Sequence, residues 1–318
     1  MNSEELSCDV IIIGGGPAGI SASIWCSDLG LSSILFEGSA EIGGQLLKIN
    51  APISNYPGVA AANGNEMRNK FETSLRAAFL NILCNEKVVS IEPESLTVIT
   101  EIGTRHTSRF IVIATGVRRR TLGVKGEIEF LGRGVLASGV GSKDLLHGKS
   151  VVIVGGGDAA LENATILSKV AETVTLIHRR DKFSARTEFV DQLSAISNLK
   201  ILKSAKVVSI NGTDAVESIT FVELETNLES TIPSDAVLIR VGVVPNTDFL
   251  GNAVETDENG YIVVDRSCQT NRPGVFAIGD ISNKTAPTIA GAVGDAATAI
   301  KIAYSLIAES NTIYCLIK

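Results

Sequence analysis

Two glycine-rich segments have the spacing of loops that bind the diphosphate of a dinucleotide. Residues 14–19 read Gly-x-Gly-x-x-Gly, and residues 155–160 read Gly-x-Gly-x-x-Ala. In such a loop the first glycine permits a tight turn and the second lets the backbone approach the phosphates, while the small third residue lets a helix pack on a strand. Each segment follows a run of Val and Ile and opens a helix-like stretch. The sequence therefore predicts two dinucleotide sites, about one domain apart along the chain.

The elements predicted around the first loop suit an adenine dinucleotide. A strand precedes the loop, a helix is predicted over 18–29, and a second strand is predicted over 33–37. The N-terminus of that helix would present free N–H groups and the positive end of its dipole to the phosphates. Glu37 ends the second strand, where a carboxylate accepts hydrogen bonds from ribose hydroxyls.

Three later segments favour FAD over NAD at this first site. Gly43-Gly-Gln45 follows the second strand, and Ala114-Thr-Gly116 ends a strand predicted over 110–114. Asp280 closes another predicted strand in the segment 273–280, where its carboxylate can accept hydrogen bonds from a ribityl chain.

The second loop leaves two occupants open. No acidic residue follows the predicted strand Thr173–Ile177, and His178, Arg179 and Arg180 stand there instead. Guanidinium groups at this position suit the 2′-phosphate of NADPH. The loop could equally hold the ADP half of another nucleotide, including a second FAD.

Together these motifs resemble the low-molecular-weight thioredoxin reductase class of flavoproteins over nearly the whole chain. The resemblance implies an α/β fold of two Rossmann-like, three-layer ββα domains, the second inserted into the first. It implies a discontinuous FAD-binding domain over 1–119 and 247–318, a second dinucleotide-binding domain over 120–246, and a homodimer.

The motifs and the resemblance assign cofactor binding to two sets of residues. The FAD set is Gly14, Gly16, Pro17, Ala18, Gly19, Glu37, Gly44, Gln45, Asn55, Val88, Ala114, Thr115, Gly116, Gly279, Asp280, Ala286, Pro287 and Thr288. The set for the second dinucleotide is Gly155, Gly157, Asp158, Ala159, Ala160, His178, Arg179 and Arg180.

The sequence departs from the resembled reductases at their redox-active Cys-x-x-Cys. Ser138 and Gly141 occupy the two cysteine positions, so thiol–disulfide exchange cannot occur there. With Gly139, these small residues would leave room for a second flat ring beside the flavin, and we take the three as candidate catalytic positions. Ser184 also replaces a family arginine after the second loop, where Lys182 and Arg186 are the nearest cations that could compensate.

The five cysteines offer no second Cys-x-x-Cys motif and no metal-ligand spacing. We therefore expect no metal. Cys315, near the C-terminus, is the candidate for a redox-active pair with another cysteine.

Two Cys-x-x-Cys-less relatives of the resembled class fit these features. The sequence favours the first, a diflavin-linked disulfide oxidoreductase, which would stack a second FAD on the first and take electrons from dithiols. The alternative is a thioredoxin-reductase-type ferredoxin–NADP reductase, which would use NADPH and pass electrons to ferredoxin or a quinone. A non-catalytic flavin-binding sensor is a third reading. The expected partners are therefore a second copy of the chain and a small redox protein, a dithiol or a quinone.

Composition narrows the function classes further. The chain has 318 residues with a net charge of −7 and a pI of about 5.2, so it has no basic footprint for nucleic acid. No apolar run reaches the roughly 18 residues that span a bilayer, and the N-terminus lacks the layout of a signal peptide. We therefore expect a cytoplasmic oxidoreductase.

Overall fold

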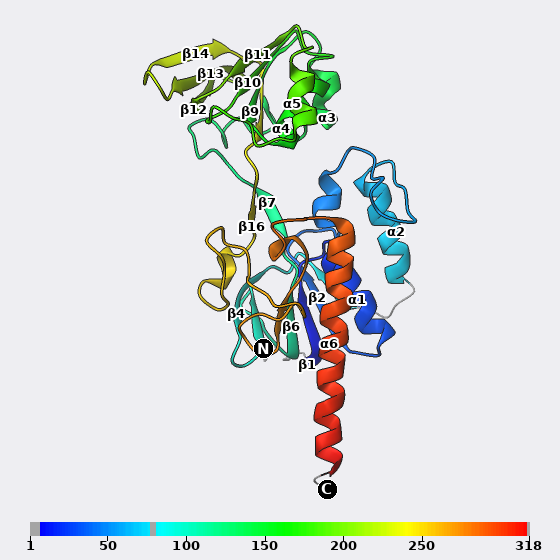
Figure 1. The fold of residues 1–318 in the computed structure, drawn as a ribbon. Coiled ribbons are helices and arrows are strands. Elements are labelled where there is room, and N and C mark those ends of the chain that lie inside the picture. The colour runs from blue at the N-terminus through cyan, green and yellow to red at the C-terminus, as the bar shows by residue number, and fades with distance from the viewer. Residues whose placement is uncertain (1–6, 77–80, 317–318) are drawn as a thin grey trace. The chain divides into compact units, whose positions relative to one another are not determined.

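The computed structural model describes residues 7–76 and 81–316, and the chain divides into two compact units (Figure 1). Unit 1 comprises Met1–Arg118 and Val244–Lys318, and unit 2 comprises Arg119–Val243. The chain passes between the units twice, and the two crossing strands, β7 (Val117–Arg119) and β16 (Val243–Pro245), pair with each other.

Unit 1 is built on a seven-stranded sheet whose order is β3-β2-β1-β6-β5-β4, with β17 also paired to β6. The strands β1, β2, β3, β6 and β17 are parallel, and β4 and β5 continue the sheet antiparallel. Their bounds are β1 (Ser7–Ile13), β2 (Ser33–Glu37), β3 (Asn81–Cys84), β4 (Val88–Glu92), β5 (Thr97–Thr100), β6 (Arg105–Ile113) and β17 (Val275–Ala277).

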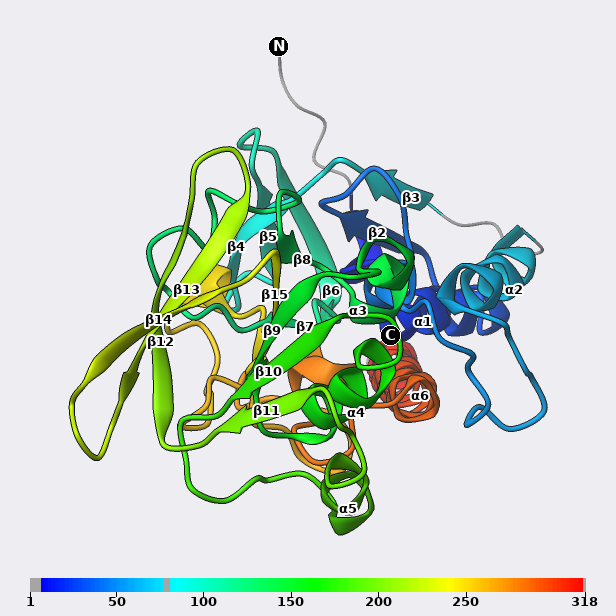
Figure 2. The same cartoon turned by 90° about the horizontal axis from the view of Figure 1, so that it is seen from above.

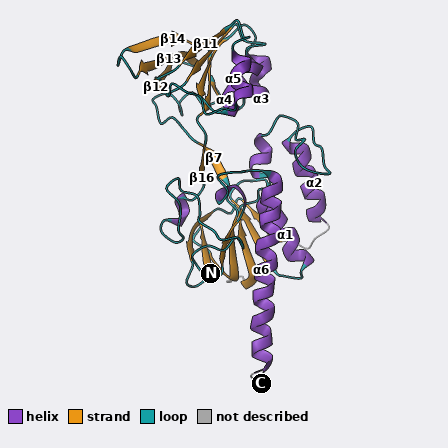
Figure 3. Cartoon of the chain, viewed as in Figure 1, coloured by secondary structure: helices purple, strands orange, loops and turns teal. Residues whose placement is uncertain are grey.

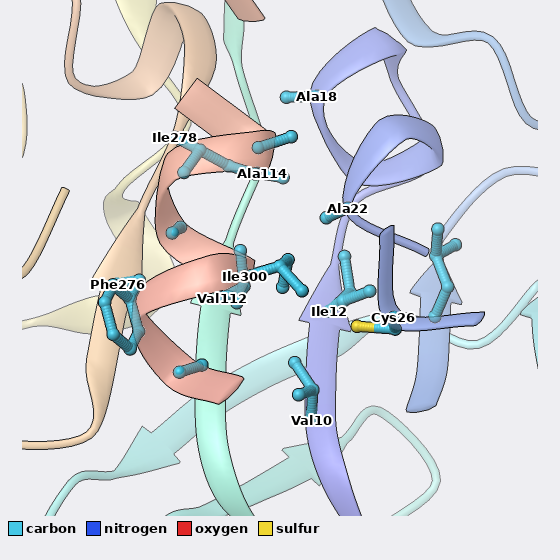
Figure 4. Packing of buried hydrophobic residues seen from close by; sticks show 14 of the residues in the cluster. Val10, Ile12, Ala18, Ala22, Cys26, Val112, Ala114, Phe276, Ile278 and Ile300 are labelled. Carbon is cyan, nitrogen blue, oxygen red and sulfur yellow. The ribbon is translucent and has the colours of Figure 1, made fainter. Parts of the chain in front are cut away.

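Different layers cover the two faces of this sheet, and each strand contributes side chains to both because successive residues point to opposite sides. Val10 and Ile12 of β1 pack against the helices α1 (Pro17–Asp28) and α6 (Ile289–Leu316), as Figure 4 shows. Ile11 and Ile13 face the opposite layer, and all four side chains are buried. A third helix, α2 (Gly64–Arg76), packs beside α1.

Small residues allow α1 and α6 to approach the sheet and each other. Ala18 and Ala22 of α1 are buried together with Ala296 and Ala299 of α6. Figure 4 shows Ala22 and Ile300 near the strand residue Ile12.

Unit 2 repeats this layering around a five-stranded parallel sheet in the order β11-β10-β9-β15-β8 (Figure 2). The strands are β8 (Val135–Leu136), β9 (Ser150–Gly155), β10 (Thr173–Ile177), β11 (Leu199–Leu202) and β15 (Ala236–Arg240). The helices are α3 (Gly139–Ser142), α4 (Asp158–Leu167) and α5 (Thr187–Leu193). The antiparallel sheet is β12 (Ala205–Gly212), β13 (Val216–Glu223) and β14 (Glu229–Pro233).

The parallel sheet of unit 2 lies between its helices and its antiparallel sheet (Figure 3). Val151 and Ile153 of β9 are buried on the helical side, whereas Val152 and Val154 are buried against the antiparallel sheet. The predicted fold class, an α/β fold with two Rossmann-like domains, is confirmed. Within the described residues, no helix is long and apolar enough to cross a membrane.

The last helix begins at Ile289, because the Thr288 hydroxyl accepts a hydrogen bond from the Gly291 amide at 3.0 Å and caps the helix there. One predicted element boundary was wrong. Asp280 does not close a strand, because β17 ends at Ala277 and Asp280 lies in the following 3-10 turn.

Candidate functional site

The first glycine-rich loop has a shape that only glycine permits at two positions. Gly14 has a φ of +105°, and a Cβ there would lie 2.6 Å from the Ala114 carbonyl oxygen. A Cβ at Gly19 would lie 1.9 Å from the Gly14 carbonyl oxygen. Gly16, in contrast, has no atom within 4 Å of the position of a Cβ, so its backbone can be approached closely.

Glu37 braces this loop from the end of β2. Its two carboxylate oxygens accept hydrogen bonds from the Gly15 and Ser39 amides, each at 2.8 Å. Glu37 also lines the cavity above the loop, where a ribose hydroxyl would meet the same carboxylate.

A cavity of about 550 Å³ opens along the carboxyl edge of the unit 1 sheet. That size is typical of a cofactor site. A second cavity of about 520 Å³ shares Gly14, Glu37, Ser39, Thr115 and Asn246 with the first. The residues predicted for FAD that line the first cavity are Gly14, Gly16, Pro17, Ala18, Glu37, Gly44, Gln45, Asn55, Ala114, Thr115, Gly116, Asp280, Pro287 and Thr288.

The other four residues predicted for FAD lie elsewhere in unit 1. Val88 lines the second cavity, and Gly19 is buried where α1 meets the loop. Gly279 forms the turn before Asp280 with a φ of +74°, and Ala286 is exposed in the loop before α6. Neither Gly279 nor Ala286 lines either cavity.

A second carboxylate, that of Asp295, acts on the turn that carries Asp280, and the sequence analysis did not single it out. Burial, and then the charge of Asp295, raise the pKa of Asp280 above its ordinary value. The Asp295 carboxylate accepts a hydrogen bond from the Gly279 amide at 3.0 Å and so fixes the turn that carries Asp280.

Sequence reasoning also missed Asn246, which lines both cavities. Its side-chain amide donates to the Thr115 carbonyl at 2.7 Å, and the Thr115 hydroxyl donates to the Asn246 carbonyl at 3.0 Å. The short motif Pro245-Asn-Thr247, where the chain returns to unit 1, is the sequence feature that could have indicated this residue.

The second glycine-rich loop lies at the carboxyl end of β9. Gly155 has a φ of +153°, and a Cβ there would lie 2.2 Å from the Arg240 carbonyl oxygen. A Cβ at Gly156 would lie 2.2 Å from the His178 ring, which covers the loop, whereas Gly157 has only the Ser184 hydroxyl at 3.7 Å. Ala160 is buried behind the loop, and Asp158 and Ala159 open α4.

The three residues after β10 differ in burial and in their contacts. His178 is buried, contacts the Lys182 carbonyl through Nε2 at 3.1 Å and packs on Phe183 with ring centroids 5.3 Å apart. Burial is the main cause that lowers the pKa of His178, so its ring is neutral near pH 7. Arg179 and Arg180 are exposed, and within the described residues neither guanidinium pairs with a carboxylate.

Arg186 does not replace the family arginine lost at Ser184. Its Nε lies 2.7 Å from the Asp158 carboxylate and its Nη1 lies 2.8 Å from Glu188. Its guanidinium also stands 4.8 Å from the centroid of the Phe189 ring. Its charge is therefore already balanced within unit 2.

Of the two positions that hold cysteine in the resembled reductases, Ser138 immediately precedes α3 and Gly141 lies within it. The Ser138 hydroxyl accepts a hydrogen bond from the Gly141 amide at 3.1 Å and caps this helix. Gly139 is buried, and a Cβ there would lie 2.1 Å from Asn163 Oδ1 of α4. Packing of α3 on α4 therefore explains why residue 139 has no side chain.

The described cysteines are free, and their environments disfavour the thiolate. Burial raises the pKa of Cys8 to about 11 and those of Cys26 and Cys268 to about 12. Burial is also the main cause that raises the pKa of Cys84. The side chain of Cys315 lies outside the described residues, so its predicted redox pair is not placed. Among the described residues, no cluster of His, Cys, Asp and Glu is arranged to hold a metal ion.

A cavity over one glycine-rich loop and a second such loop in a separate Rossmann-like unit are the features expected of a protein that binds two dinucleotides. Residues 8–301 match the family model described as pyridine nucleotide-disulphide oxidoreductase, and the chain belongs to this family.

Relatives extend this assignment over almost the whole chain. A thioredoxin reductase of Listeria innocua is 35% identical over 310 residues, which cover 97% of each protein. The crystal structure of Lactococcus lactis thioredoxin reductase has a TM-score of 0.83 at 31% identity, covering 95% of this chain and 99% of that one. A Bacillus cereus bacillithiol disulfide reductase shares the fold, with a TM-score of 0.77 at 20% identity over 94% of this chain and 99% of that one. The predicted enzyme class, an FAD-dependent oxidoreductase of the thioredoxin reductase type, is confirmed.

Proposed function

We propose that this enzyme oxidises NADPH and passes the electrons through FAD to an external carrier, without a disulfide of its own at the family position. Unit 1 is the FAD-binding domain in this proposal, and unit 2 is the NADPH-binding domain. The observation that carries it is the exposed pair Arg179 and Arg180 after β10, which no carboxylate neutralises among the described residues.

The residues of unit 1 suit FAD along the length of its cavities. The Gly14–Gly19 loop would hold the diphosphate against the N-terminus of α1, and Glu37 would accept from the ribose hydroxyls. Asp280 would accept from the ribityl chain. The start of α6, at Thr288 and Ile289, also lines the cavity, and its positive dipole end favours negative charge there.

FAD, when bound, supplies a ring that takes up two electrons and gives them up together or singly. NADPH would become NADP⁺ with loss of two electrons and one proton. Two one-electron carriers such as ferredoxin would take the electrons while the proton goes to solvent, or one quinone would take both electrons with that proton and one more from solvent. Ser138 and Gly141 cannot form the disulfide of the resembled reductases. We therefore do not propose thioredoxin as the partner, although several relatives of this chain are thioredoxin reductases. The family resemblance also leads us to propose a homodimer.

One observation favours a second FAD in unit 2 instead. Ser184 lacks the charge of the family arginine, and Arg186 is already paired with Asp158 and Glu188, so fewer cations remain for a 2′-phosphate. In that diflavin arrangement the electrons would come from dithiols.

The experiment that separates these functions has two readouts on the purified holoenzyme. Cofactors are released by denaturation and FAD is counted per chain, and a second sample is mixed with NADPH without oxygen. One FAD per chain that NADPH bleaches supports the proposal. Two FAD per chain with no response to NADPH would replace it with the diflavin function. One FAD with no response to NADPH contradicts both.

A further inference from the structure

Two arginines lie at the carboxyl end of the unit 2 sheet. Arg240 is the last residue of β15, and its Cα is in register with that of Gly155 at the end of β9. Arg119 ends β7, and its Nη1 donates to the Ala137 carbonyl, beside the start of α3. The Arg120 amide donates to the Gly242 carbonyl at 3.0 Å, which holds this segment alongside the chain that leaves β15.

Arg240 is half-buried and Arg119 is exposed. Burial, and then the charge of Arg119, lower the pKa of Arg240 to about 10. Partial desolvation also lowers the pKa of Arg119. Throughout the described residues, neither guanidinium forms an ion pair. A guanidinium has five N–H donors, and we see one hydrogen bond from each, to the carbonyls of Ala137 and Ile239.

The position of the pair in the sheet indicates what would neutralise it. In an open α/β sheet, ligands cross the carboxyl edge where the strand order reverses. In unit 2 that point lies between β9 and β15, with β10 on the far side of β9. A dinucleotide with its adenosine over Arg179 and its diphosphate over Gly155–Gly157 would therefore run toward Arg240.

We propose that Arg119 and Arg240 form an anion site that binds the diphosphate of the dinucleotide on the second loop, at the phosphate farther from the adenosine. Two guanidinium charges match the two charges of a diphosphate, and Arg suits phosphate geometry through paired N–H donors. This inference rests on the proposed function only in requiring a dinucleotide on unit 2. NADPH and FAD carry the same diphosphate, so it holds for either occupant.

A pair of ligands tests the site by calorimetry on the FAD-loaded protein. The ligand 2′-phospho-ADP-ribose carries the second phosphate, whereas adenosine 2′,5′-bisphosphate lacks it. For Arg240→Ala we expect an affinity for the first ligand at least about tenfold weaker, since a charge-assisted hydrogen bond is lost. The affinity for the second ligand should stay within about twofold, because its phosphates are bound elsewhere.

Arg120→Ala is the matched control, because it removes an equal charge one residue from Arg119. Equal weakening by Arg120→Ala would reduce the effect to general electrostatics and overturn the site. Arg119→Ala should reproduce the selective loss, which guards against a folding defect peculiar to Arg240→Ala. FAD content and thermal unfolding of each variant check the fold.

Arg179→Ala separates the inference from the proposed function. It should weaken both ligands, because both contain the 2′-phosphate. If it weakens neither while Arg240→Ala stays selective, the NADPH assignment fails and the anion site stands. If the wild type instead carries two FAD per chain, Arg240→Ala should retain one, and retention of both would refute the site. Binding of inorganic pyrophosphate that Arg240→Ala abolishes, with both nucleotide affinities unchanged, would assign the site to a free anion and overturn the proposal.

Discussion

Substitution of Gly139 tests whether the small residues at α3 are required for helix packing or leave room for a second redox-active ring. A methyl group at this position would lie 2.1 Å from Asn163 Oδ1 and 3.0 Å from Leu238 Cδ2. Overpacking of this kind costs typically about 1–3 kcal/mol. We therefore expect Gly139→Ala to lower the free energy of unfolding of unit 2 by roughly that amount and to leave FAD bound in unit 1.

A double-mutant cycle with Asn163→Ala identifies the contact. Asn163 Oδ1 is buried without a hydrogen-bond partner among the described residues, so shortening this side chain opens space for the new methyl group. The two substitutions should therefore show a favourable coupling of about 1 kcal/mol.

Hydrogen exchange across residues 139–167 and urea unfolding followed by circular dichroism measure these effects. Gly294→Ala is the control, because nothing lies within 4 Å of its Cβ position in α6. That control should be neutral or stabilising by up to about 1 kcal/mol. An unchanged stability of Gly139→Ala, or strict additivity with Asn163→Ala, would refute the packing account.

Three further predictions concern the loops and one buried histidine. Glu37→Gln should lower the stability of unit 1 by about 1.5–3 kcal/mol and weaken FAD binding, because an amide cannot accept from the Gly15 N–H with the strength of a carboxylate; urea unfolding and FAD titration check this. His106→Phe should stabilise the protein, because neither ring nitrogen of the buried His106 has a hydrogen-bond partner among the residues that the structure describes, and the ring already packs on Phe36. Burial lowers the pKa of His106 below its ordinary 6.5, so the wild type should lose stability as the pH falls from 7 to 5, and the variant should lose less in thermal melts. Arg179→Ala should raise the KM for NADPH about tenfold or more and leave that for NADH nearly unchanged in steady-state assays.

For each of these three predictions, one result would contradict the stated reason. A Glu37→Gln protein as stable as the wild type would mean that the carboxylate does not brace the loop. Identical pH dependence in His106→Phe would assign the acid sensitivity to other groups. Equal losses with NADPH and NADH in Arg179→Ala would exclude a contact with the 2′-phosphate.

Much of the fold was predictable because its signals are local. The strands over 33–37 and 173–177 were predicted with the bounds that the structure shows, since each is a short, mainly apolar run that ends at or just before a polar residue. The need for glycine at position 19 is likewise local, because a Cβ there would meet the Gly14 carbonyl oxygen. The strand before Asp280 was predicted too long, because the 3-10 turn over Gly279–Ile281 follows a run of apolar residues that continues past the strand's end at Ala277.

The parts of the site that could not be predicted depend on contacts between distant residues. Asn246 pairs with Thr115, 131 residues earlier, and no spacing in the sequence announces that contact. Arg186 was expected as a cation for a phosphate, yet its partner Asp158 lies 28 residues away. The reason for glycine at position 139 is a side chain on another helix. Such roles follow from tertiary packing, which a single sequence does not display.

The central claim is that electrons pass from NADPH to one FAD per chain. Its most direct test is to count FAD released from the purified protein and to follow the flavin absorbance after NADPH is added without oxygen. The account predicts one FAD per chain and full bleaching by about one equivalent of NADPH, because both carry two electrons. Two FAD per chain, or a flavin that NADPH leaves oxidised, would contradict it.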